Sequence, residues 1–155
     1  MYDYTDELIE LAIAEDIGDG DHTSLSCIPK EETGMVQLLV KEEGILAGVK
    51  ITKRILEKID KDLQMEVYID DGSEIKAGDI AFKISGPVIS ILQAERLLLN
   101  FMQRMSGIAT QTAEYAELIK DLTIKVLDTR KTTPGLRHIE KLAVGIGGGG
   151  RLQRF

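Results

Sequence analysis

Apolar residues recur along the chain with two different spacings, and one of these is the spacing typical of an amphipathic helix. In residues 5–15, apolar side chains recur at helical spacing, and carboxylates gather near the start, where the dipole of a helix favours negative charge. The same spacing returns in residues 49–59 and, with a wide apolar surface, in residues 88–105. We therefore expect a helix over each range, and a further helix over residues 106–120 that begins with Ser106 as its N-cap.

The other period, of two residues, predicts three short strands. Apolar residues alternate with polar ones in residues 65–69 and 80–84, and less regularly in residues 35–40. The turn pairs between and after these ranges are Asp71-Gly72, Gly78-Asp79 and Gly86-Pro87. Short alternating strands joined by such turns predict a small, mainly antiparallel sheet with one buried face.

Near the end of the chain, a short apolar run precedes a polar loop and another helix. Residues 124–127 have the length of a strand, residues 128–135 end in Pro134-Gly135, and residues 136–144 regain helical spacing. Strand, loop and helix form the start of a β/α unit. Ligands of such folds collect at the carboxyl ends of strands, so the loop is a candidate binding segment.

Composition limits the class of protein. The 155 residues suffice for one domain with the start of another. The single cysteine, Cys27, cannot form an internal disulfide, and no apolar run has the roughly 20 residues of a membrane helix. The N-terminus carries no secretory signal pattern, so a cytoplasmic location is expected. The glycine- and aspartate-rich residues 16–24 predict a loop, but they lack the turn glycine and closing glutamate of a calcium site, so no metal ligands are expected there.

Charge divides the chain into two unlike halves. The net charge of −7 argues against general nucleic-acid binding. It combines 8 Lys+Arg with 20 Asp+Glu in residues 1–79, and 11 Lys+Arg with 6 Asp+Glu in residues 80–155. The basic half is where an anion could bind.

Two features of the basic half are candidates for function. Arg96 leads a stripe of hydrogen-bonding residues on the 88–105 helix, which is either a solvent-facing stripe or a functional one. In the loop, the adjacent Arg130 and Lys131 would point in different directions and could hold two anionic groups, with threonine hydroxyls beside them. This arrangement suits a polyanionic small molecule, although an ordinary solvated loop is the alternative.

The ordered motifs of the chain resemble the quinolinate phosphoribosyltransferase family, also called nicotinate-nucleotide pyrophosphorylase (carboxylating). The most specific of them is the loop itself. The matching segments are Ala14-Glu15-Asp16-Ile17-Gly18, Gly20-Asp21-His22-Thr23-Ser24, Leu46-Ala47-Gly48, Gly78-Asp79, Ala94-Glu95-Arg96, Leu99-Asn100-Phe101, Ser106-Gly107-Ile108-Ala109-Thr110, Asp128-Thr129-Arg130-Lys131-Thr132-Thr133-Pro134-Gly135-Leu136-Arg137, Glu140-Lys141 and Ala143-Val144.

The resemblance implies an α+β N-terminal sandwich domain with a linking helix over residues 1–105, followed by the first part of an α/β barrel over residues 106–155. It further implies a homodimer. The implied reaction joins quinolinate to phosphoribosyl pyrophosphate, with Mg²⁺, to give nicotinate mononucleotide, CO2 and pyrophosphate in NAD synthesis. By motif, the implied substrate ligands are Thr129, Arg130, Lys131 and Thr132, with Arg96 supplied across the dimer.

Catalytic residues are not assigned by these motifs. Histidine is a common acid–base residue, which makes His22 and His138 candidates, but a local hydrogen-bonding role is expected for His22 and a surface position for His138. The resemblance implies that catalysis comes from a cationic pocket, which holds two anionic substrates together and stabilises the charge that develops as pyrophosphate leaves.

The sequence departs from the family after the glycine run 147–150. The family has an Asn-His-Arg stretch there, followed by a lysine and two acidic residues, whereas this chain continues with residues 151–155. A single β/α unit cannot close a barrel. We therefore expect a truncated or frameshifted copy of a longer enzyme. The alternative is a catalytically incomplete fragment or a non-catalytic docking subunit.

Overall fold

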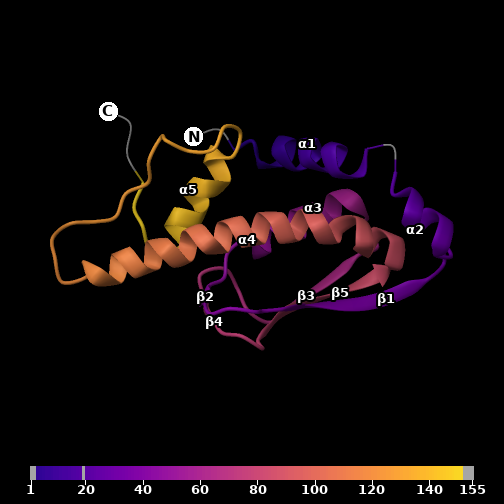
Figure 1. Ribbon diagram of the computed structural model, residues 1–155, viewed down its shortest axis with the longest axis horizontal. Coiled ribbons are helices and arrows are strands. Elements are labelled where there is room, and N and C mark those ends of the chain that lie inside the picture. Colours follow the sequence, from indigo (N-terminus) through magenta and orange to yellow (C-terminus); the bar gives the residue numbers. More distant parts are fainter. Residues whose placement is uncertain (1–2, 19, 152–155) are drawn as a thin grey trace.

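The computed structural model describes residues 3–18 and 20–151 and contains five helices and five strands in those ranges (Figure 1). Of the residues at which the sequence departs from the family, 151–155, the last four lie outside the described part, as does residue 19 of the predicted 16–24 loop. In chain order the elements are α1 (Thr5–Ile17), α2 (His22–Cys27), β1 (Thr33–Leu39), β2 (Gly44–Ile45), α3 (Val49–Ile59), β3 (Gln64–Val67), β4 (Glu74–Ile75), β5 (Ile80–Pro87), α4 (Val88–Leu118) and α5 (Arg137–Ile146).

A three-stranded antiparallel sheet with the order β1-β5-β3 forms one layer, as the alternation predicts. Strands β2 and β4 form a separate two-stranded ladder, which the sequence pattern does not reveal. Helices α3 and α4 lie over one side of the larger sheet, and α1 lies beyond them in Figure 1. The core between these layers includes Phe82 and Ile84 of β5, Ile55 of α3 and Leu98 of α4.

Helix α4 is continuous from Val88 to Leu118, so the prediction that Ser106 begins a separate helix is wrong. The hydroxyl of Ser106 instead accepts a hydrogen bond from the backbone N–H of Ala47 at 3.0 Å and donates one to the Ala47 carbonyl at 3.1 Å. One turn later, Oγ1 of Thr110 accepts from the N–H of Ile45 at 2.9 Å. These hydroxyls satisfy backbone groups next to β2. The division expected between residues 105 and 106 thus falls inside one helix.

Part of the loop predicted over residues 16–24 is helical. Helix α2 begins at His22, and the Asp21 carboxylate accepts a hydrogen bond from the backbone N–H of Ser24 at 3.1 Å. An aspartate in this position satisfies an amide that the first turn leaves without a partner. The prediction of a loop is therefore wrong for residues 22–24, where the N-cap begins a short helix, and for residues 16–17, which end α1.

The strand predicted over residues 124–127 does not form in the described chain. Its last residue, Leu127, makes only an isolated parallel bridge to Gly150. A parallel strand needs neighbouring strands to complete its hydrogen bonds, and the part of the chain that the structure describes supplies a single residue. The loop and the helix that follow are confirmed, the helix as α5.

The glycine run holds α5 close to α4. A side-chain carbon at Gly147 would overlap the backbone oxygen of Ala109, and one at Gly149 would crowd Thr112 and Val144. The close approach of the two helices therefore requires glycine at these positions. Among the described residues, no helix is both long enough and apolar enough to cross a membrane.

Candidate anion-binding site

The basic loop, residues 128–135, places Arg130 and Lys131 at the surface. Both residues are exposed, and within residues 3–18 and 20–151 neither charged group has an ion pair. The backbone N–H of Lys131 donates to Oγ1 of Thr129 at 3.1 Å. The two cations are thus open to solvent, which fits both a ligand-binding loop and the ordinary solvated loop, and their role as substrate ligands stays a prediction.

Helix α5 holds the middle of the basic loop in place. Arg137, its first residue, donates from Nε to Oγ1 of Thr132 at 3.2 Å and from a terminal nitrogen to the Arg130 carbonyl at 3.3 Å. The hydroxyls of Thr129 and Thr132 act only as acceptors in these bonds, so each keeps its O–H to donate to a ligand.

The end of the loop is held by Glu140 of α5 and Arg104 of α4. Arg104 donates to Oε1 of Glu140 from Nε at 2.9 Å, and a terminal nitrogen contacts both this oxygen and the Thr133 hydroxyl. The other oxygen of Glu140 accepts the Thr133 N–H at 3.2 Å. Burial raises the pKa of Glu140, but the hydrogen bonds from Arg104 and Thr133 outweigh it, and the pKa is held below its ordinary value.

The start of the loop is held by a buried ion pair. Nζ of Lys141 lies 2.7 Å from Oδ1 of Asp128, with 8% and 1% of the respective side chains exposed. The N–H of Asp128 donates to the carbonyl of Gly150 at 3.0 Å. The loop is therefore fixed at both ends and in the middle, which lowers the entropy that it loses when an anion binds.

Sequence reasoning did not assign roles to Arg104, Arg137, Glu140 and Lys141. A signal for the last two was present, because two adjacent charges lie between the apolar Ile139 and Leu142 on a short helix. Both are buried in the structure. Charged residues on such a face need a partner, and the nearest unassigned charges are those of the preceding loop.

Arg96, the other predicted site residue, is not brought to the basic loop. Its side chain is 73% exposed, and it pairs with Oδ1 of Asp16 at 3.1 Å. No contact joins it to residues 129–132 within the described ranges. Asn100 and Gln103 are exposed as well, so the stripe faces solvent in this chain. Its proposed contribution across a dimer stays a prediction.

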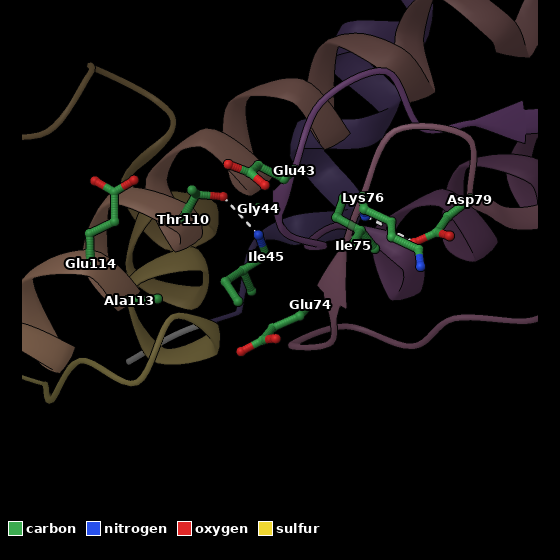
Figure 2. A pocket seen from close by; sticks show the side chains of 10 residues that line it. All are labelled: Glu43, Gly44, Ile45, Glu74, Ile75, Lys76, Asp79, Thr110, Ala113 and Glu114. Carbon is green, nitrogen blue, oxygen red and sulfur yellow. Dashed lines mark hydrogen bonds between the residues drawn. The ribbon is translucent and has the colours of Figure 1, made fainter.

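A hollow of about 570 Å³ between α4 and the β2–β4 ladder has the opposite charge (Figure 2). Its lining includes the acidic residues Glu43, Glu74, Asp79 and Glu114, against a single lysine, Lys76. Such a surface repels anions. Across residues 3–18 and 20–151, no three His, Cys, Asp or Glu side chains are grouped so that they could hold a metal ion.

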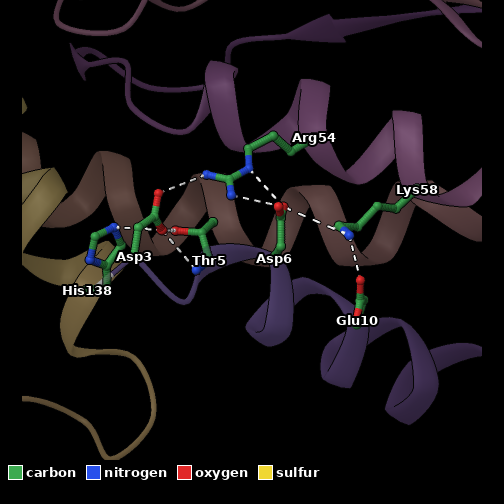
Figure 3. A network of polar contacts seen from close by, with 7 residues as sticks. All are labelled: Asp3, Thr5, Asp6, Glu10, Arg54, Lys58 and His138. Carbon is green, nitrogen blue, oxygen red and sulfur yellow. Dashed lines mark hydrogen bonds and ion pairs between the residues drawn. The ribbon is translucent and has the colours of Figure 1, made fainter.

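The N-terminal segment contacts His138 at the start of α5, and Figure 3 shows Asp3 next to this histidine. The backbone N–H of His138 donates to the hydroxyl of Tyr4 at 3.0 Å, and Nε2 of His138 lies 3.2 Å from Oδ1 of Asp3. His138 is buried, so its predicted surface position is wrong. The residues that cover it are 134 positions away along the chain, which local sequence patterns do not reveal.

The carboxyl group of Asp3 should titrate far below its usual range. Hydrogen bonds from the side chain and backbone of Thr5 lower its pKa to about 2, with smaller contributions from His138 and Arg54. A carboxylate whose pKa is lower in the folded state stabilises that state above the ordinary value of 3.8, and this contribution is lost as the pH falls toward 2. NMR titration of the Asp3 side-chain carbon should therefore show a midpoint near 2. A midpoint near 3.8 would contradict the contacts in Figure 3.

Family models match nearly all of the described chain. The model for the N-terminal domain of quinolinate phosphoribosyl transferase matches residues 21–106, and that for the C-terminal domain matches residues 108–155. Among the curated relatives, quinolinate phosphoribosyltransferase [decarboxylating] 1b of Nicotiana tabacum is 47% identical over 92% of this chain and 40% of its own length. A probable nicotinate-nucleotide pyrophosphorylase [carboxylating] of Bacillus subtilis is 43% identical over 92% of this chain and 49% of its own length.

The fold agrees with solved structures as well. NadC from Streptococcus pyogenes superposes with a TM-score of 0.92 and 39% identity, over 96% of this chain and 53% of that one. The match confirms the expected fold, a sandwich domain followed by the start of the barrel region. This chain thus spans about half the length of the relatives it matches. On these matches, the chain belongs to the quinolinate phosphoribosyltransferase family.

Proposed function

We propose that the chain provides part of the substrate site for phosphoribosyl transfer from phosphoribosyl pyrophosphate to quinolinate, with loss of CO2 and pyrophosphate. The observation that supports this most directly is the basic loop, on which a scaffold fixed at three points presents two cations that have no ion pair in the described part of the chain. The names of the relatives support the same reaction class. The product would be nicotinate mononucleotide, in the cytoplasmic synthesis of NAD.

The role of the loop in this reaction would be electrostatic. Quinolinate and phosphoribosyl pyrophosphate are both polyanions that repel each other, and binding them side by side requires cations. Arg130 offers a planar pair of donors for a carboxylate or phosphate, and Lys131 offers a compact charge. Thr129 and Thr132 would donate their hydroxyls. Cations fixed before the substrates bind stabilise the charge of departing pyrophosphate without reorganisation.

We propose no site for Mg²⁺ among the side chains of the basic loop. The exposed charged groups of the basic loop are the cations of Arg130 and Lys131, which are not ligands for a metal ion. We expect Mg²⁺ to enter with phosphoribosyl pyrophosphate, whose phosphate oxygens are suitable ligands. No step is assigned to the ion in this chain.

A homodimer would bring Arg96 to the second subunit's basic loop. The exposure of Arg96 supports this arrangement, because an exposed surface pair such as that with Asp16 contributes little and is readily exchanged.

A second candidate function is a non-catalytic docking subunit or an incomplete fragment. It is favoured by the share of the relatives that this chain spans, 40–49% of their length.

The test is an assay for nicotinate mononucleotide with the purified chain, alone and mixed with an intact homologue whose counterpart of Arg96 is replaced by methionine. We expect no product from the chain alone and restored activity in the mixture, since Arg96 would be supplied in trans. The Arg96→Met variant of this chain is the control and should not restore activity. Product from the chain alone would show a complete site, and no product in either case would contradict a part in the transfer.

A further inference from the structure

Arg104 joins the basic loop to a distant part of the chain. It lies on α4, whose first half packs against the sheet, and its guanidinium reaches the last turn of the loop and the first turns of α5. It contacts one carboxylate oxygen of Glu140 and the hydroxyl of Thr133. Glu140 returns to the same loop residue through the Thr133 N–H. The hydroxyl and the N–H of Thr133 are therefore both held from outside the loop.

The charge of Arg104 is committed to Glu140. The Glu140 side chain is 11% exposed, and a carboxylate at that depth needs a cation and hydrogen bonds to stay ionised. Arg104 supplies two donors to a single oxygen of this carboxylate. In this respect Arg104 differs from Arg130 and Lys131, whose charges have no counterpart in the described chain and remain available to a ligand.

We infer that Arg104 and Glu140 are positioning residues, which hold Thr133 and thereby set the direction of Lys131 and Thr132 toward an anionic ligand. The inference rests on the function proposed above for the basic loop. Lys131 is only two residues from Thr133, and the Thr132 hydroxyl is oriented from the other side by Arg137. If Thr133 lost its contacts with Arg104 and Glu140, residues 131–133 would be held to α5 through the bond from Arg137 to Thr132.

The planar fork of arginine is essential to this role. Its Nε and a terminal nitrogen face Glu140 together, and the same terminal nitrogen reaches Thr133. A lysine at residue 104 keeps the positive charge but offers one ammonium group, which does not reproduce these directions. Arg104→Lys therefore changes the hydrogen-bond geometry at Glu140 and Thr133 while it keeps the positive charge at residue 104.

The test measures loop order and anion binding separately, in the full chain. Amide hydrogen exchange of residues 131–133 reports loop order, and calorimetric titration with pyrophosphate reports binding. For Arg104→Lys we expect loop exchange faster by about tenfold and pyrophosphate binding weaker by about tenfold, the effect of one charge-assisted contact. The exchange of α3 and β5 should be unchanged.

Thr133 provides a milder pair of variants that keep Arg104 and Glu140 in place. Thr133→Val removes the hydroxyl and should speed loop exchange by about threefold to tenfold. Thr133→Ser keeps the hydroxyl and should restore the exchange and the binding of the unmodified chain. Lys58→Met is the control, because it removes the pair with Glu10 between α1 and α3 and should alter neither measurement.

Three results would overturn the inference. Unchanged loop exchange in both Arg104→Lys and Thr133→Val would show that Thr133 needs no support. Exchange that rises equally throughout the chain would indicate a general structural role. Equal pyrophosphate affinity of Arg104→Lys and the unmodified chain, with a loss only in Arg104→Met, would make Arg104 a direct ligand. Failure of the unmodified chain to bind pyrophosphate would contradict the proposed function instead, while the exchange data would still decide the positioning role.

Discussion

Replacement of Lys141 by methionine should lower the free energy of unfolding by about 3–5 kcal/mol, because it removes one partner of the buried Lys141–Asp128 ion pair. The Asp128 side chain is 1% exposed, and Nζ of Lys141 lies 2.7 Å from its Oδ1. The loss should appear in urea denaturation at pH 7 as a lower midpoint with an unchanged slope.

Two variants separate the buried charge from a general effect of removing a lysine. Lys120→Met removes an exposed pair with Glu117 and should cost less than about 1 kcal/mol. The double variant Lys141→Met with Asp128→Asn should recover much of the loss, because a neutral amide is less costly to bury than a carboxylate. A similar loss for Lys141→Met and Lys120→Met would show that the Lys141–Asp128 pair does not stabilise the fold.

The elements that could be predicted from sequence are those that local periodicity determines. Helix α3 and strand β5 carry a single clear period, and both form where that period lies. Ser106 misled the prediction because a serine before an apolar run is a common N-cap. Its partner, the backbone of Ala47, is 59 residues away, so the local pattern could not distinguish a cap from a contact between elements.

The strand expected over residues 124–127 illustrates a different limit. Its composition suits a strand, but a parallel strand is stabilised by its neighbours and not by its own sequence. In the described chain Leu127 finds one bridge partner, Gly150, and Ile124 stays exposed. Local sequence therefore predicts the capacity of such a segment to form a strand, and the rest of the sheet decides the outcome.

The two exposed cations of the basic loop could be predicted from the sequence, but the residues that hold the loop could not. Arg130 and Lys131 are adjacent in the sequence, and their chemistry alone points to an anion. Arg104 lies 36 residues from Glu140, and only the packing of α4 against α5 brings them together. The residues that hold a binding loop are thus harder to identify from sequence than those that bind, because their partners are distant along the chain.

Arg130→Met should weaken pyrophosphate binding by about tenfold to a hundredfold, the effect expected when a charged hydrogen-bonding group is removed from an anion site. Lys131→Met should have a similar effect. The double variant should abolish measurable binding in calorimetric titration. Stability should barely change in these variants, because neither charged group is paired in the described chain and both side chains are exposed.

Lys50→Met is the matched control for this experiment. Lys50 is exposed on α3 and its loss changes the net charge by the same amount, so it reveals any effect of overall charge on pyrophosphate binding. If the net charge of the whole chain determined pyrophosphate binding, Lys50→Met and Arg130→Met would weaken binding equally, and high salt would abolish the effect of both variants. A loss confined to Arg130 and Lys131 that persists at high salt requires direct contact with the anion, which is what a loop fixed at three points is arranged to provide.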